Sequence, residues 1–182
     1  SSLNDFKKAC RELNLQAKIK IVEPFFADDR YNEIIADCIE KSARNLNTDD
    51  ITLVFSAHSL PQKIIDAGDV YEEHVKRHVQ ILTEILEKRG VKFKQTMLAY
   101  QSRLGPVKWL EPSLNQVLAE LKDKKALIYP ISFCIDNSET VFELSKEFKH
   151  IADELKFDFY DVAACPNDDD KFAKFIADKA KE

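Results

Sequence analysis

The sequence has no stretch of 18 apolar residues, so it predicts no transmembrane helix, and its first residues lack the pattern of a signal peptide. Only three glycines occur, which suits a compact α/β domain with short turns. The four cysteines form no CxxC pair; they are Cys10, Cys38, Cys134 and Cys165. They therefore predict neither a structural zinc site nor an iron–sulfur cluster, and we interpret them as reduced thiols of a cytoplasmic protein.

The composition that remains is that of an ordinary globular protein. The chain has 182 residues, of which 45% are hydrophobic and 32% are charged, enough for one domain with a sizeable core. The formal net charge is -5 and the pI is near 5.5. A mildly acidic chain disfavours nucleic acid as a partner, because phosphate binding favours a basic face.

Strand-like and helix-like segments alternate along the chain. We expect strands at about 17–22, 51–55, 93–100, 126–133 and 157–162, and helices at about 29–43, 70–88, 112–122, 138–155 and 169–180. This alternation predicts an α/β fold with a mainly parallel sheet flanked by helices. Ligands of such folds bind beyond the carboxyl ends of the strands, so we expect functional residues in the segments after Phe55, Tyr100 and Phe133.

The first of these segments contains His58, which directly follows an apolar strand. A histidine here either caps the strand through a hydrogen bond or presents a neutral imidazole that binds a metal or accepts a proton. Pro61 would stiffen the loop that presents it. Position alone leaves both interpretations open.

The second segment runs from Tyr100 to Trp109 and contains two aromatic and two cationic side chains with a Gly-Pro turn. One interpretation is a surface loop with Trp109 anchored in the core. The other is that Tyr100 and Trp109 offer flat apolar surfaces while Arg103 and Lys108 offer charge. That mixture suits a planar ligand with carboxylate tails.

The third segment contains Asp136, Glu139 and Glu143, which share one face if all three are helical. Acids in a first turn are also favoured by the helix dipole, and Asp136 or Ser138 is a candidate N-cap. Glu143 lies too deep in the helix for that explanation. Three acids projecting toward the ligand edge would attract a cation.

Two other sequence features give little support for a metal site. His74 and His78 have the i, i+4 spacing of a helical zinc pair, but the residues between them are Val-Lys-Arg and not the pattern of zinc proteases. Asp168, Asp169 and Asp170 lack the alternating acids, the glycine and the terminal glutamate of a calcium loop, and predict a helix start instead.

Taken in order, the strings SAHSLP, YQSRLGPVKWLEP and SF-x2-D-x2-ETVFEL resemble the C-terminal half of ferrochelatases. The resemblance covers the chain from about Ser1 to its end, and it points to the bacterial type without a C-terminal iron–sulfur tail. It implies a Rossmann-like chelatase half, with residues 1–182 as a single C-terminal domain and the N-terminal half missing. The family's porphyrin cleft lies between two such halves.

The resemblance also implies roles for individual residues. His58 corresponds to the metal-side histidine, Glu139 to an acid facing it across the porphyrin, and Asp136 and Glu143 to an accessory acidic path. Asn137 stands where many members have histidine, which puts a proton-relay role at that position in doubt. The implied cleft residues are Ser59, Leu60, Pro61, Tyr100, Gln101, Ser102, Arg103 and Trp109.

The function implied is insertion of ferrous iron into protoporphyrin IX or a related porphyrin, with release of two protons. Iron is then a substrate, and we expect no permanently bound cofactor. The expected location is the cytoplasm, with peripheral membrane contact and oligomeric state left open. The alternatives are a cobalt or nickel chelatase of the same fold, and a non-catalytic metal- or tetrapyrrole-binding module. With one wall of the cleft missing, the fragment alone is expected to be a poor catalyst.

Overall fold

The fold is built on a four-stranded sheet in which all neighbouring strands are parallel. The computed structural model describes residues 2–182. The strands are β1 (Thr52–His58), β2 (Gln95–Gln101), β3 (Lys125–Tyr129) and β4 (Phe159–Val162), in the spatial order β2-β1-β3-β4. The predicted α/β class and parallel sheet are therefore confirmed. Because β1 lies between β2 and β3, the carboxyl ends of these three strands meet at one edge of the sheet.

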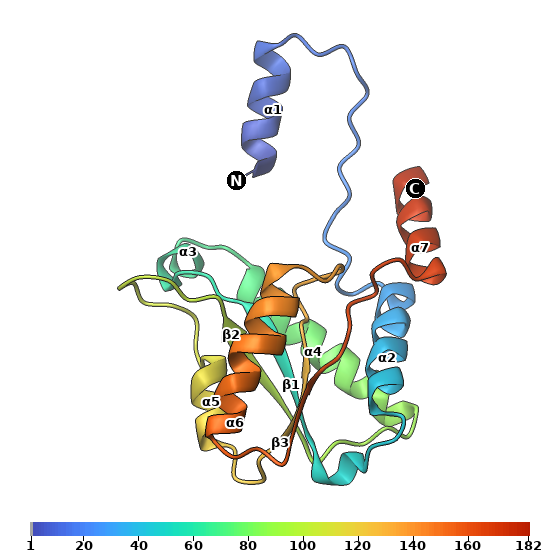
Figure 1. Cartoon of the computed structure of the whole chain (residues 1–182). Coiled ribbons are helices and arrows are strands. Elements are labelled where there is room, and N and C mark those ends of the chain that lie inside the picture. Colours follow the sequence, from blue (N-terminus) through green and yellow to red (C-terminus); the bar gives the residue numbers. More distant parts are fainter. Residues whose placement is uncertain (1) are drawn as a thin grey trace.

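Helices cover both faces of this sheet (Figure 1). One face is covered by α2 (Asp29–Ala43), α4 (Tyr71–Lys88) and α7 (Asp170–Lys181). The other is covered by α5 (Leu114–Glu120), the π-helix η2 (Ser138–Phe148) and α6 (Lys149–Glu154). The remaining helices are α1 (Ser2–Glu12), α3 (Gln62–Asp66) and the short 3-10 helix η1 (Thr48–Asp50). Across the described chain, no helix has the length and apolarity needed to cross a bilayer.

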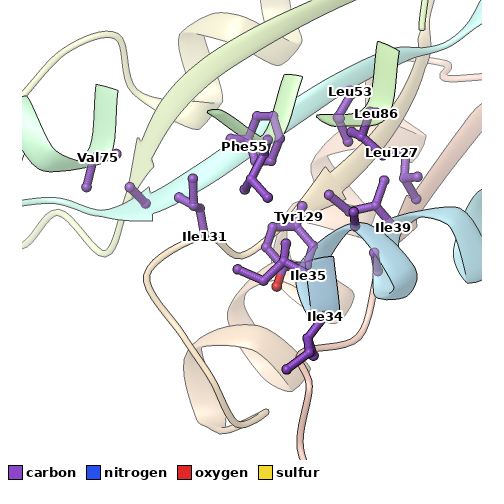
Figure 2. Close-up of a cluster of buried hydrophobic side chains, with 14 of the residues drawn as sticks. Ile34, Ile35, Ile39, Leu53, Phe55, Val75, Leu86, Leu127, Tyr129 and Ile131 are labelled. Atoms are coloured by element: carbon purple, nitrogen blue, oxygen red, sulfur yellow. The ribbon is translucent and has the colours of Figure 1, made fainter. Parts of the chain in front are cut away.

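Each face of the sheet has its own apolar cluster, because successive side chains of a strand point to opposite faces. Leu53 and Phe55 of β1 pack toward α2 and α4, whereas Val54 packs toward α5 and η2. Figure 2 shows the first cluster, in which Tyr129 lies between Phe55 of β1 and Ile35 of α2. All of β1 up to Ala57 is buried, as the continuous apolar run predicted.

Local signals explain where the long helices begin and end. The carboxylate of Asp28 accepts a hydrogen bond from the amide of Arg30 and caps α2. Gly90 follows α4 with φ +78, a conformation that glycine adopts without strain, so it ends this helix as predicted. The observed bounds of both helices differ from the expected ones by no more than one residue.

The expected strand at 17–22 is wrong. These residues are extended but, within residues 2–182, they pair with no other strand, and Ile19 and Ile21 are exposed. The alternating pattern made this segment resemble a strand, but a strand also requires a neighbour for its backbone hydrogen bonds. The segment instead carries α1, which stands apart from the body of the molecule (Figure 1). The sheet therefore has four strands and not five.

Two further boundaries differ from expectation near the predicted site. The third strand of the sheet, β3, ends at Tyr129 and not at Phe133, because Pro130 has no amide hydrogen to continue the ladder. The long helix expected from Ser138 begins there, but its first eleven residues are π-helical and only the rest is α-helical. Its N-cap is Asn137, and not Asp136 or Ser138.

Candidate functional site: a histidine–glutamate pair at the carboxyl edge of the sheet

His58 is the last residue of β1, and its backbone is held by a closed ring of hydrogen bonds. Its amide donates to Ser132 Oγ (3.2 Å), and Tyr71 Oη donates to its carbonyl (2.8 Å). Tyr71 Oη also lies 2.6 Å from Ser132 Oγ. Since the tyrosine proton goes to the carbonyl, the serine hydroxyl donates to the tyrosine oxygen, and every group in the ring is satisfied. Burial raises the pKa of Tyr71, so this hydroxyl stays protonated.

The His58 side chain meets Glu139, which lies in the first turn of η2. His58 Nδ1 and Glu139 Oε2 are 2.7 Å apart, and the two side chains are 39% and 34% exposed. The amide of Glu139 donates to the Asn137 side chain, which caps the helix. A carboxylate beside Nδ1 favours the tautomer with the proton on that nitrogen, so Nε2 keeps its lone pair for a ligand or a proton.

Ser102 joins Glu139 to Glu143 at the end of β2. Its hydroxyl lies 2.8 Å from Glu139 Oε2 and 2.5 Å from Glu143 Oε2, and its amide donates to Glu143 Oε1 (2.7 Å). A hydroxyl has a single proton, so the two carboxylates compete for it. Ser102 has φ +61, a left-handed conformation that directs its amide and hydroxyl toward the same helix.

Gln101 is buried and connects the same elements. Its side-chain oxygen accepts from Ser56 Oγ (2.7 Å), and its amide nitrogen donates to the Glu139 carbonyl (3.1 Å) and to Glu143 Oε2 (3.3 Å). Beside Glu143, residues from the end of β2, the start of α5 and the helix η2 line a pocket of about 300 Å³, and Glu147 is among them. The structure thus brings His58, Glu139 and Glu143 into one network, as their positions after neighbouring strands predicted.

Asp136 is not part of that network. Its Oδ2 accepts from Asn167 Nδ2 (2.6 Å), and its Oδ1 lies 3.5 Å from the amide of Cys165. The expectation that Asp136 lies beside Glu139 and Glu143 failed because Asp136 precedes the helix cap. The i, i+3 rule holds only between helical residues.

The predicted cleft residues fall into two groups. Leu60 and Pro61 pair with the segment around Trp109: the Leu110 amide donates to the Leu60 carbonyl (3.1 Å), and Pro61 and Trp109 form an antiparallel bridge. Ser59 lies beside His58, and its amide donates to the Gln101 carbonyl (2.9 Å). The segment that follows His58 is therefore paired with the end of β2 and with the loop after it.

The second group differs from expectation. Tyr100 is 1% exposed and packs in the core on the α4 side, so its ring offers no flat surface to a ligand. Arg103 is partly buried, with its guanidinium 3.9 Å from Glu111. Tyr100 is buried because successive side chains of β2 point to opposite faces of the sheet. Gln101 points toward η2, and Tyr100 points toward the other face.

Within residues 2–182, no group of three or more His, Cys, Asp or Glu side chains is arranged to hold a metal ion. A cation at His58 and Glu139 would therefore have few protein ligands. Ser59 follows His58 in the chain and Trp109 pairs with Pro61; among the described residues, the buried atoms Ser59 Oγ and Trp109 Nε1 have no hydrogen-bond partner. Buried polar atoms without partners are uncommon, and here they lie on the loops that present His58.

Sequence reasoning missed the residues that hold the pair in place. Tyr71 is the first residue of a helix and gave no chemical signal, and Ser132 was noticed only as part of a string. Asn167 lies in a loop whose composition predicted only a helix start. The one available signal was a polar side chain at or shortly after the end of a buried strand: Gln101 ends β2, and Ser132 lies three residues beyond the end of β3.

The fold and the site define a class of protein: a parallel α/β domain with an imidazole–carboxylate pair at the carboxyl edge of its sheet. Comparison with known proteins gives the family. The sequence profile described as Ferrochelatase matches residues 1–182. The chain belongs to the ferrochelatase family.

Individual relatives agree with this assignment. A protein named Ferrochelatase from Campylobacter concisus (strain 13826) is 59% identical over 181 residues, with 100% of this chain and 57% of the relative covered. The corresponding values are 53%, 100% and 58% for one from Campylobacter fetus, and 48%, 97% and 56% for one from Wolinella succinogenes. The chain therefore spans a little over half the length of the curated relatives it matches.

A solved structure from Deinococcus radiodurans, described as a multi-domain protein with structural similarity to chelatases, is also similar. It superimposes with a TM-score of 0.49 and 18% sequence identity, covering 82% of this chain and 29% of that one.

Proposed function

We propose that the complete protein containing this chain inserts ferrous iron into protoporphyrin IX or a closely related porphyrin. The observation that carries the proposal is the hydrogen-bonded pair of His58 and Glu139 at the carboxyl edge of the sheet, in a chain of the ferrochelatase family. Because the chain covers only about 57% of its relatives, we further propose that residues 1–182 are the C-terminal half and that the remainder supplies the other wall of the cleft.

The chemistry of the pair suits this reaction. Insertion replaces two pyrrole N–H bonds by bonds to iron and releases two protons, with no change in the oxidation state of the metal. The Nε2 lone pair of His58 binds the ferrous ion or accepts one of these protons, while the Glu139 carboxylate compensates the positive charge in either case. Imidazole and carboxylate bind ferrous iron without the strong affinity of thiolates, so the metal can be passed on.

The separation of the pair supports one orientation toward the porphyrin. A flat ring held between two atoms requires them to be about 7 Å apart, two van der Waals contacts of about 3.5 Å each. His58 Nδ1 and Glu139 Oε2 are 2.7 Å apart. We therefore place both groups on the same side of the macrocycle, in place of the opposed arrangement expected from the resemblance.

The proposal also covers cofactors and cellular location. We propose that iron is a substrate, that the protein has no resident cofactor and no iron–sulfur cluster, and that it is cytoplasmic. Peripheral membrane contact is supported by the loop after β2, where Leu104 is 82% exposed and Val107 is exposed beside Lys108. Cosedimentation of the protein with anionic vesicles tests it: binding that Leu104→Ser weakens is expected, and no binding at low salt would contradict it.

The test of the main proposal is an anaerobic assay of the full-length protein with ferrous iron and protoporphyrin IX. Loss of porphyrin fluorescence and appearance of haem absorbance are expected. Glu139→Gln should lower kcat by about 100-fold or more, in the range of acid–base contributions. Glu154→Gln is the matched control, because Glu154 is exposed and its carboxylate pairs with His150.

The assay also separates the alternatives. Porphyrin binding without turnover by any divalent metal would identify a binding module and refute the proposed activity. Faster insertion of cobalt or nickel than of iron would identify a chelatase with another physiological metal.

A further inference from the structure

Asn167 and Asp136 hold each other through a reciprocal pair of hydrogen bonds. The amide of Asp136 donates to Asn167 Oδ1 (2.7 Å), and Asn167 Nδ2 donates to Asp136 Oδ2 (2.6 Å). The backbone amide of Asn167 adds a third bond, to the Cys134 carbonyl (3.0 Å). These bonds tie the segment 134–136 to the loop between β4 and α7.

The tied segment leads directly into the site. Asp136 is followed by Asn137, the N-cap of η2, and Glu139 lies two residues further on. Residues 135, 137 and 138 are exposed, so in the stretch just before Glu139 it is Asp136 that makes the hydrogen bonds to another part of the chain. The loop that carries Asn167 is itself fixed, since Cys165 and Pro166 are buried.

We propose that Asn167 and Asp136 form a positioning clamp that fixes the start of η2 and thereby the place of the Glu139 carboxylate beside His58. In this role Asp136 acts as a hydrogen-bond acceptor, and its charge is not used to conduct a metal ion or a proton. The inference rests on the proposed function, because it assigns these residues to the site that performs it.

Asn167 is suited to the clamp by its backbone as well as its side chain. Its φ is +54, a left-handed conformation that asparagine adopts more readily than most residues. The side-chain amide offers one acceptor and two donors, which matches a backbone N–H and a carboxylate placed side by side. An aspartate at this position would bring two carboxylates together at 2.6 Å.

The first test separates charge from hydrogen bonding at Asp136 in the full-length protein. Asp136→Asn keeps an oxygen that accepts from Asn167, so kcat should fall by no more than about threefold. Asp136→Ala removes the acceptor, so kcat should fall by about 10- to 100-fold, the range that a misplacement of about 1 Å can cause. The matched control is Asp168→Asn, which removes a charge from the exposed neighbour of Asn167. A large loss in Asp136→Asn would overturn the clamp and support an acidic path.

The second test is a reconstitution. Asn167→Asp should reduce kcat as strongly as Asp136→Ala, because the two carboxylates repel each other. The double variant Asp136→Asn/Asn167→Asp restores a donor opposite an acceptor and should recover kcat to within about fivefold of the wild type. Failure of the double variant to recover, with its fold intact by circular dichroism, would contradict the clamp.

A third measurement does not depend on turnover. Asn167→Gly keeps the left-handed backbone and removes both side-chain bonds. Hydrogen exchange at the amides of Glu139 and Thr140 should accelerate by about tenfold or more, with the amides of α4 unchanged. Unchanged exchange at Glu139 would refute the clamp even if the wild type inserts iron. Accelerated exchange in a protein that inserts no metal would retain the clamp and refute only the proposed function.

Discussion

The Ser102 hydroxyl is the group whose removal tests the network around Glu139 most directly. Ser102→Gly deletes the contacts at 2.8 and 2.5 Å to Glu139 and Glu143 while the backbone amide continues to donate to Glu143. Glycine also adopts φ +61 without strain, so the loop should keep its course. The substitution therefore separates the hydroxyl from the backbone.

The size of the effect follows from the acceptor. A hydrogen bond to a charged group contributes about 1.5–3 kcal/mol, and only one such bond exists at a time because the hydroxyl has one proton. At about 1.4 kcal/mol per factor of ten, kcat/KM for ferrous iron should fall by about 10- to 100-fold. The KM for porphyrin should change little, because Ser102 holds the carboxylates that we assign to the metal and not the ring.

The assay compares Ser102→Gly with Ser102→Ala in the full-length protein, using initial rates at varied iron and urea unfolding for stability. Both variants lack the hydroxyl, but only glycine relieves the left-handed strain, so they should lose similar activity and differ in stability. Ser138→Ala, at an exposed serine of η2, is the control. Wild-type kcat/KM in Ser102→Gly would refute the reasoning.

Three further predictions concern other parts of the molecule. His58→Ala should lower kcat for iron insertion by about 100-fold or more with unchanged unfolding, and normal turnover would refute its role; His150→Ala is the control. Burial lowers the pKa of His78 from 6.5 to about 4, so its contribution to stability is complete above pH 6.5 and is lost as the pH falls toward 4. In urea unfolding, the free energy of unfolding should fall by about 2 kcal/mol between pH 7 and pH 5 because of His78, and His78→Leu should lack this decrease. An equal pH dependence in the variant would contradict the role of His78. Finally, the 182-residue chain alone should fold, by circular dichroism, but insert iron at least tenfold more slowly than the full-length protein, because positioning the macrocycle requires both walls; equal rates would mean that the rest is dispensable.

The sheet and its main helices were predictable because each depends on a local pattern. The run around Phe55 is apolar on both faces and became the central strand, and the periodic residues of α2 became its buried stripe. The segment 17–22 had an equally good strand pattern and remained unpaired. Pairing is decided by a neighbouring backbone, about which the local sequence contains no information.

At the site, too, some features were predictable from the local sequence and others were not. His58, Glu139 and Glu143 were found because they lie at the end of a strand or in the segment after one, and parallel strands bring these ends together. Their mutual distances, the side of the porphyrin that we propose for them, and the proposed clamp at Asp136 were not predictable. These depend on hydrogen bonds between segments separated by 29 to 81 residues in the chain.

The network is also consistent with the proposed reaction, in which two ligands would hold a metal that must leave again. The backbone of His58 is held by Tyr71 and Ser132, and Glu139 is held through its cap and through Ser102. The protein therefore fixes the geometry of the pair without help from a bound ion. A site with many ligands would hold iron more tightly and release it more slowly. In the proposed reaction, an incomplete set of ligands on a fixed scaffold would leave coordination positions free, which the pyrrole nitrogens of the porphyrin would occupy one after another.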